Sequence, residues 1–169
     1  MQVPESESDQ RRWLVARARQ VLESVPVRPG DTIVDFGCGS GAYAVPAAEL
    51  AGPGGTVHAI DCDADRIQAL ESAAREAGAH NLRPIHGDGG ARIPLDDGCC
   101  DVGLLYDVLQ NIEDWGGLFS EMRRVLRPGG ILSVYPMHLD PDDIRAALAA
   151  AGFRFRDDYA GLVLHFVRE

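Results

Sequence analysis

The feature that most constrains this chain is a short apolar segment, residues 32–36, followed at once by three glycines at alternate positions within residues 37–41. Such a run predicts a buried strand that enters a tight turn. Glycines also let a ligand approach the main chain, because no Cβ stands in the way. A helix predicted to start near Ala42 would direct its free N–H groups at the same turn. The stretch therefore predicts a ligand-binding turn, with the acid Asp35 beside it.

The basic side chains narrow the choice of chemistry. All sixteen are arginines, and the chain has no lysine. This excludes a GK[ST] phosphate-binding loop, a Schiff-base lysine and a catalytic tyrosine–lysine pair. The formal net charge of -10 would repel a nucleic-acid backbone. A hydrophobic content of 46% is ordinary for a soluble globular protein.

Cysteine and histidine spacing gives no sign of a metal centre or a redox motif. The cysteines lie at Cys38, Cys62, Cys99 and Cys100, and they form no C-x-x-C pair. The histidines also lack the spacing of metal ligands. No secretory signal and no apolar run of membrane-spanning length is recognised. We therefore expect a cytoplasmic protein without metal and without membrane contact.

Periodicity and chain breakers divide the sequence into alternating elements. The first eight residues are polar and aperiodic, which predicts a flexible tail (1–8) before a single domain (9–169). Helices are predicted at residues 9–25, 42–50, 64–77, 118–126 and 140–151. Strands are predicted at residues 32–36, 56–61, 82–86, 101–106, 131–135, 153–159 and 162–167.

The order of these elements predicts an α/β fold. Alternating strands and helices form a mainly parallel sheet with helices on both faces, a Rossmann-like doubly wound arrangement. Only Ala160 and Gly161 separate the last two of the seven strands, so these must form an antiparallel hairpin.

Distinctive polar residues stand where the predicted parallel strands end. They are Asp35, Asp61, Asp88, Tyr106 and Asp107. Ligands of such sheets bind beyond the carboxyl ends of the strands, where the strand order reverses. A single binding site could therefore contain all five residues.

Two kinds of adenosine cofactor fit the glycine turn. The glycines and Ala42 satisfy the G-x-G-x-x-G/A dinucleotide pattern, with Asp61 twenty residues after Gly41. A nicotinamide-dependent oxidoreductase is therefore one hypothesis. Three features favour another cofactor: Asp35 suits an ammonium group better than a pyrophosphate, the C-terminal hairpin adds an antiparallel strand, and no tyrosine–lysine pair exists.

At the level of motifs the chain resembles the class I S-adenosylmethionine-dependent methyltransferases. Residues 35–41, Asp-Phe-Gly-Cys-Gly-Ser-Gly, look like motif I of that family. Asp61 falls at the position of its ribose-binding acid, and residues 87–88 resemble its adenine-contacting segment. Residues 101–112 are similar to motif IV of small-molecule members such as the quinone-biosynthesis type. Residues 121–131, which include Arg-Pro-Gly-Gly, match the usual entry to the fifth strand.

The resemblance implies S-adenosylmethionine as the cofactor and gives roles to individual residues. Asp35 would attract the ammonium group, Asp61 would hold the ribose, Asp88 would accept from the adenine amino group and Tyr106 would lie near the sulfonium. The implied cofactor-binding residues are Asp35, Gly37, Cys38, Gly39, Gly41, Asp61, Cys62, Asp88, Gly89 and Tyr106.

Simpler roles stay open for several of these residues. An acid at a strand end, such as Asp61 or Asp88, can cap the next helix or be solvated. Tyr106 can pack in the core as well as contact a ligand. Tyr43 suits a packing role in the first turn of its helix.

Catalysis by in-line methyl transfer depends mainly on positioning and on a dry site, so no catalytic base is obligatory. If the acceptor must lose a proton, Asp107 and His138 are the candidates, each at the exit of a strand. Histidine suits the role because a free imidazole titrates near neutral pH. A solvated loop histidine is the alternative for His138.

The acceptor is expected to be a small molecule. The Asn/Asp-Pro-Pro-Tyr signature of amino-group nucleic-acid methyltransferases is absent after the fourth strand. Only residues 136–139 separate the fifth strand from the last helix, so the pocket cover must come from elsewhere. The N-terminal helix, the loop at residues 107–116 and the second subunit of a homodimer are the three alternatives. A protein that binds S-adenosylmethionine without turnover is the competing hypothesis.

Overall fold

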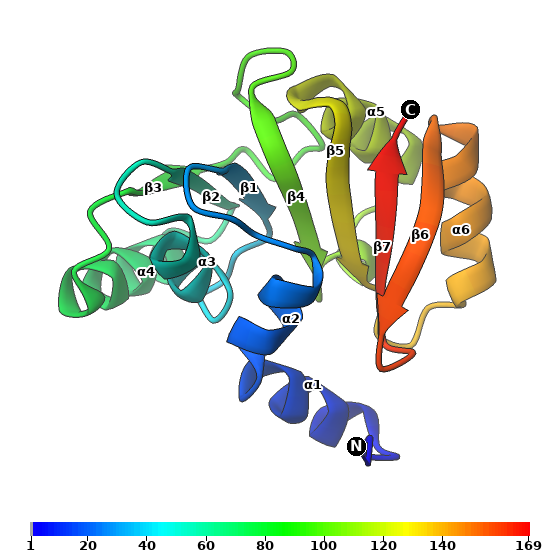
Figure 1. The fold of residues 1–169 in the computed structure, drawn as a ribbon, viewed down its shortest axis with the longest axis horizontal. Coiled ribbons are helices and arrows are strands. Elements are labelled where there is room, and N and C mark those ends of the chain that lie inside the picture. Colours follow the sequence, from blue (N-terminus) through cyan, green and yellow to red (C-terminus); the bar gives the residue numbers. More distant parts are fainter. Residues whose placement is uncertain (1) are drawn as a thin grey trace.

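The computed structural model describes residues 2–169, and Met1, the first residue of the predicted tail, lies outside them. The described chain folds around one seven-stranded sheet with strand order β3-β2-β1-β4-β5-β7-β6 (Figure 1). Strands β1 to β5 are parallel to one another, while β7 is antiparallel to β5 and to β6. The predicted fold class, including the C-terminal hairpin, is confirmed.

The helices and strands follow the predicted order. The helices are α1 (Glu7–Val15), α2 (Ala18–Ser24), α3 (Ala44–Ala51), α4 (Ala64–Ala77), η1 (Leu109–Asn111), α5 (Trp115–Val125) and α6 (Pro141–Ala150). The strands are β1 (Thr32–Phe36), β2 (Thr56–Asp61), β3 (Leu82–His86), β4 (Cys100–Tyr106), β5 (Leu126–Tyr135), β6 (Phe153–Tyr159) and β7 (Val163–Arg168).

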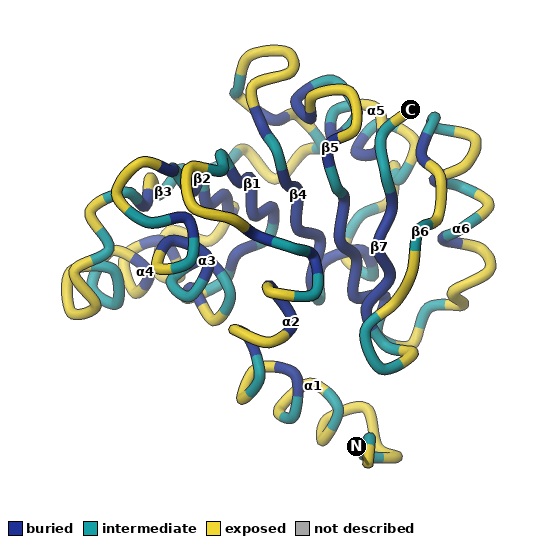
Figure 2. Tube along the Cα trace, viewed as in Figure 1, coloured by how far each residue is buried: buried dark blue, intermediate teal, exposed yellow. Residues whose placement is uncertain are grey.

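Two apolar layers hold the helices against the sheet. Side chains of α2, α3 and α4 form one buried cluster with one face of the strands, and side chains of α5 and α6 form the other. The middle of the sheet is buried, whereas the outer sides of the helices are exposed (Figure 2). Burial on both faces explains why β1 and β4 read as nearly continuous apolar runs.

The strand order places a switch point between β1 and β4. The chain builds outward from β1 to β3 and then returns to pair β4 with β1, with Asp35 opposite Leu104. In a doubly wound sheet this is where the connections leave a crevice at the carboxyl ends of the strands.

The structure corrects some predicted boundaries. The predicted helix at residues 9–25 is two helices, because the backbone of Arg17 leaves helical geometry at φ -118° and ψ 20°. Helix α1 begins at Glu7, two residues inside the predicted tail, and Ser6 caps it by accepting from the amide of Asp9. Strand β5 begins at Leu126, before the Arg-Pro-Gly-Gly segment, because Leu126 already pairs with Cys100 of β4; the segment then forms an irregularity in the pairing, with Gly129 at φ 76°.

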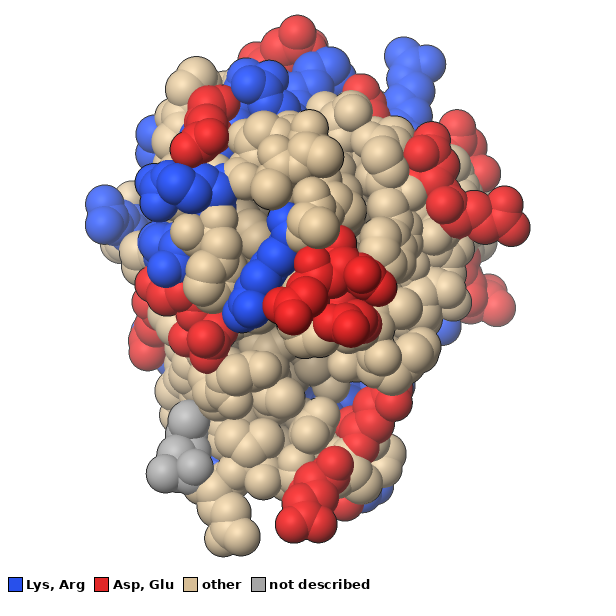
Figure 3. Space-filling view, turned by 90° about the vertical axis from the view of Figure 1, so that its right-hand side faces the viewer, with Lys and Arg blue, Asp and Glu red and all other residues tan. Residues whose placement is uncertain are grey.

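Strand β6 forms one edge of the sheet and carries charges of both signs. Arg154, Arg156, Asp157 and Asp158 lie along it. On the face that carries β6 and α6, acidic and basic side chains are interspersed among neutral ones (Figure 3). Charged side chains on an edge strand oppose pairing with another sheet. Among the described residues, no helix combines the length and the apolar character needed to span a membrane.

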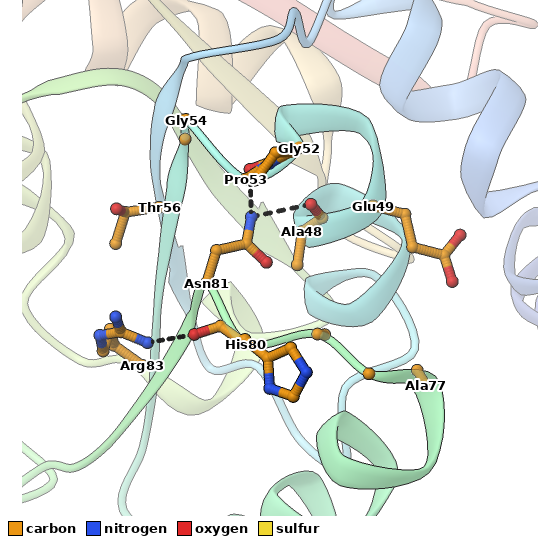
Figure 4. A pocket seen from close by; sticks show the side chains of 13 residues that line it. Ala48, Glu49, Gly52, Pro53, Gly54, Thr56, Ala77, His80, Asn81 and Arg83 are labelled. Atoms are coloured by element: carbon orange, nitrogen blue, oxygen red, sulfur yellow. Dashed lines mark hydrogen bonds between the residues drawn. The ribbon is translucent and has the colours of Figure 1, made fainter.

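A shallow depression lies at the amino ends of β2 and β3, between the loops that follow α3 and α4. Its most ordered side chain is Asn81, whose Nδ2 donates to the carbonyl oxygens of Ala48 at 2.9 Å and Gly52 at 2.8 Å (Figure 4). These bonds satisfy carbonyls at the C-terminal end of α3. The depression faces away from the carboxyl ends of the strands, and its role is structural.

We expect Asn81→Ala to lower the free energy of unfolding by about 1–2 kcal/mol, because two carbonyls lose their partner. Urea unfolding followed by circular dichroism measures the change. His80→Ala, which truncates the exposed neighbouring side chain, is the matched control. Equal stability of the two variants would show that the Asn81 bonds contribute nothing.

Candidate functional site

The glycine turn that follows β1 is bound to the end of β2. The amides of Gly37 and Cys38 both donate to the carbonyl oxygen of Ile60, at 2.8 and 3.0 Å. Gly37 has φ 77°, and a Cβ at this position would lie 2.4 Å from Cγ2 of Val108. Only glycine therefore satisfies both the backbone conformation and the close packing.

The carboxylate of Asp61 connects the same two strands. Its Oδ2 accepts from the amide of Gly39 at 2.8 Å, and its Oδ1 accepts from the amide of Asp63 at 3.0 Å. The side chain is buried, and Nη1 of Arg66 lies 4.0 Å from Oδ2. Asp61 thus fixes the glycine turn relative to the start of α4. Its two oxygens can still accept further hydrogen bonds.

A pocket opens at this edge of the sheet, between the β1 and β2 ends and the loops that follow β3 and β4. Of the predicted residues it contains Gly37, Asp61, Cys62, Asp88, Gly89 and Asp107. Gly87, which the resemblance placed in the adenine-contacting segment, also lines it, and the residues not assigned a role from the sequence are Phe36, Ile60, Arg66, Gly90, Arg92, Val108, Asn111 and Ile112. The apolar members belong to strand ends and to the loop after β4, where only the fold shows which side chains face the pocket.

The pocket combines apolar walls with acidic groups. Ile60, Val108 and Ile112 supply flat apolar surface. Asp88 is exposed at the rim, where its Oδ1 accepts from the amide of Gly90 at 2.9 Å. This combination suits a nucleoside, whose base is flat and whose sugar and amino groups donate hydrogen bonds.

Asp35 lies behind the pocket and is unusual for a carboxylate. It is 2% exposed, and its Oδ2 has no hydrogen-bond partner among residues 2–169. Burial, together with the nearby charge of Asp61, raises its pKa to about 7. A buried carboxylate without a partner is costly. A cationic group bound beside it would compensate that cost.

Of the other predicted residues, Cys38, Gly39 and Gly41 form the turn itself. The Cys38 thiol is buried, and this burial raises its pKa far above the ordinary value, so it stays protonated. Gly39 and Gly41 have φ 54° and 98°. None of the three is among the residues that line the pocket.

Tyr106 has the packing role that the sequence left open. It is 4% exposed, its hydroxyl lies 2.6 Å from Oγ of Ser133, and its ring meets the edge of Tyr43 at 4.6 Å between centroids. Its predicted position near the sulfonium stays a prediction.

The two candidate bases both pair with helix α1. Oδ2 of Asp107 lies 2.6 Å from Nε of Arg11, and its Oδ1 accepts from Nε2 of Gln110 at 2.9 Å. Nδ1 of His138 lies 3.3 Å from Oε1 of Glu7. Asp107 reaches the pocket, whereas His138 stands outside it in the loop after β5. No local pattern in the sequence indicates these pairs, because their members are about 100 residues or more apart.

The buried Asp35 predicts a pH dependence of stability. Its pKa is about 7 in the folded protein and about 4 in the unfolded chain. The folded state therefore binds more protons in this window, and the free energy of unfolding falls as the pH rises from 4 to 7. We expect Asp35→Asn, which is neutral throughout, to gain roughly 2–3 kcal/mol relative to the wild type between pH 5 and pH 8.

Urea unfolding at several pH values measures this difference. Asp88→Asn removes an exposed carboxylate from the same edge and controls for the change in net charge. A constant difference between Asp35→Asn and the wild type would contradict the prediction.

The comparisons with known proteins agree with this geometry. Residues 34–134 match the family described as "Methyltransferase domain". The chain is 30% identical over 113 residues to a demethylmenaquinone methyltransferase of Geobacillus stearothermophilus, a match that covers 67% of this chain and 48% of that protein. The chain thus spans about half the length of the curated relatives it matches.

Solved structures confirm the fold. A SAM dependent methyltransferase from Aquifex aeolicus superimposes with a TM-score of 0.78 at 18% identity, covering 97% of this chain and 98% of that one. The magnesium protoporphyrin IX methyltransferase of Synechocystis PCC 6803, solved with bound SAM, gives a TM-score of 0.73 at 21% identity and covers 94% and 79%. The chain therefore belongs to the methyltransferase domain family, within the class I group that uses S-adenosylmethionine, as its motifs predicted.

Proposed function

We propose that this protein transfers a methyl group from S-adenosylmethionine to a small-molecule acceptor. The observation that carries the proposal is the pocket at the switch point, which Gly37 of the glycine turn and the carboxylate of Asp61 line, with the buried carboxylate of Asp35 close to Asp61. This set of groups matches a ligand that is a nucleoside at one end and a cation at the other.

Each part of the pocket has a role in holding the cofactor. The bound cofactor would supply an electrophilic methyl group on a sulfonium. Asp35 would offset its ammonium charge, and the exposed main chain at residues 37–41 would allow close approach of its methionine part. Asp61 would accept from the ribose hydroxyls, and Asp88 would accept from the adenine amino group. Cys62 and Gly89 would complete the adenine end of the pocket.

The acceptor is proposed from the relatives and from the composition. Curated relatives are named demethylmenaquinone methyltransferases, and similar small aromatic acceptors are the class we propose here. The net charge of -10 disfavours nucleic acid as a substrate. A homodimer is still a prediction.

Rate acceleration would come from positioning and from exclusion of water rather than from a covalent step. Helix α1 and the loop after β4 would supply the water-excluding cover. Asp107 and His138 stay candidates for a base. Asp107 is the better placed, since it lines the pocket, but it must first leave its pair with Arg11 before it can accept a proton.

Binding without turnover is the second candidate function. It is favoured by the same ion pair, which engages the candidate base, and by the short connection after β5, which adds little cover to the acceptor side. The nicotinamide hypothesis loses its support, because the matched family is a methyltransferase family.

We expect S-adenosylhomocysteine at 100 times its Kd to stabilise the protein by about 2.7 kcal/mol, which raises the Tm by roughly 5–10 °C. NAD at the same concentration should leave the Tm unchanged. Differential scanning fluorimetry measures both. Radiolabelled methyl transfer to a metabolite extract then separates the enzyme from a non-catalytic binding protein. Stabilisation by NAD alone would refute the proposed cofactor.

The ribose role of Asp61 has its own test. Wild-type protein should bind adenosine at least about tenfold more tightly than 2′,3′-dideoxyadenosine, because hydrogen bonds to a carboxylate are lost. Asp61→Asn should reduce this preference. Asp63→Asn, which affects the adjacent cap of α4 outside the pocket, is the matched control. Calorimetric titration measures all six affinities, and an unchanged preference in Asp61→Asn would reject the role.

A further inference from the structure

Aromatic side chains gather beside the pocket, beyond the carboxyl ends of β4 and β5. Tyr106 and Tyr135 are neighbours in the register of these strands, and Tyr43 packs on Tyr106. Asp107 connects this group to the cofactor pocket, because it lines the pocket and also acts on the hydroxyls of Tyr43 and Tyr135 through its charge. The tyrosines therefore stand next to the place where a methyl group would be delivered.

Tyr135 differs from Tyr106 in the hydrogen bonding of its hydroxyl. The hydroxyl of Tyr106 pairs with Ser133. The side chain of Tyr135 is only 2% exposed, and its hydroxyl has no hydrogen-bond partner among the described residues. A buried unpaired hydroxyl destabilises the folded state and calls for an explanation. Burial and the carboxylates of Asp107 and Glu7 raise the pKa of Tyr135, so this hydroxyl keeps its proton and can donate it in a hydrogen bond.

Helix α1 lies close to this hydroxyl, because the charges of its Glu7 and Arg11 act on Tyr135 and its Leu14 belongs to the same buried cluster. It lies beyond the ends of the strands, at the same end as the β6–β7 turn (Figure 1). Leu14 is its one fully buried side chain, and Trp13 contacts Tyr159 at 6.1 Å between ring centroids. The pair between Arg11 and Asp107 connects the helix to the loop after β4, and the arginine is 60% exposed. Exposed ion pairs contribute little stability, so α1 can open at low cost.

We propose that the hydroxyl of Tyr135, at the end of β5, selects the methyl acceptor by donating a hydrogen bond to one of its oxygen atoms when α1 opens. The Arg11–Asp107 pair, like the pair of Glu7 with His138, is one contact of closed α1, and it breaks when α1 opens to admit the acceptor. The aromatic walls select a planar aromatic compound with a phenolic or carbonyl oxygen. This inference rests on the proposed methyltransferase function and gives that function an acceptor site.

The hydroxyl is tested with two probes of the same shape, 1-naphthol and 1-methylnaphthalene, on the full chain saturated with S-adenosylhomocysteine. The wild type should bind 1-naphthol about tenfold more tightly, the gain expected from one buried hydrogen bond. Tyr135→Phe should abolish this preference without weakening 1-methylnaphthalene. Tyr106→Phe removes a hydroxyl that already has a partner, and it should keep the preference. A preference that survives in Tyr135→Phe, or a wild type that binds neither probe, overturns the proposal.

The gate is tested by Arg11→Met, which keeps the aliphatic stem and removes the ion pair. Hydrogen exchange in residues 7–15 and the association rate of 1-naphthol should both increase. Arg12→Met is the matched control, because the ion pair of Arg12 with Asp9 stays within α1. Equal exchange and equal association rates in the two variants would overturn the gate.

Binding of S-adenosylhomocysteine, measured in every variant, distinguishes failure of the acceptor site from failure of the proposed function. Retained binding with unchanged probe affinities rejects the acceptor site and leaves the proposed function standing. Absence of that binding in the wild type rejects the proposed function itself.

Discussion

The attachment of the glycine turn to the end of β2 is the interaction on which the rest of the site depends. Two consecutive amides of the turn donate to the carbonyl of Ile60, and a third, that of Gly39, donates to the carboxylate of Asp61. These bonds give the turn one position relative to the sheet. They also leave its outer main chain bare, because three of its residues have no side chain. A cofactor site made largely of backbone needs this rigidity, since backbone groups cannot adjust by changing rotamer.

The buried acid behind this turn shows how stability and function oppose one another. Asp35 holds a carboxylate in a place where burial and the charge of Asp61 disfavour ionisation. A fold optimised for stability alone would place an apolar side chain there. The unpaired Oδ2 of Asp35 is explained if a bound cation pairs with it. In the same way, the unpaired hydroxyl of Tyr135 is explained if it donates a hydrogen bond to an oxygen of the acceptor. Both groups lie at the end of the sheet where ligands of such folds bind.

Most of the fold and the polar part of the pocket could be predicted from local pattern. Apolar runs, glycine breaks and strand-end acids are properties of short segments, and they predicted all seven strands and the switch-point site. The break at Arg17 and the early start of β5 were missed, because neither has a glycine or proline at the point of change. Lining residues such as Val108 and Asn111 were missed because their side-chain directions depend on how the loop after β4 packs.

What the sequence by itself determined is the order of the elements and the chemistry of the glycine turn, because periodicity and backbone freedom are local. It also predicted Asp61 and Asp88 at the edge where the pocket forms. Only the tertiary structure decided that Asp35 is buried without a full set of partners, and that Asp107 pairs with Arg11. The physical reason is that burial and ion pairing depend on contacts between residues far apart in the chain, and no local pattern encodes those distances.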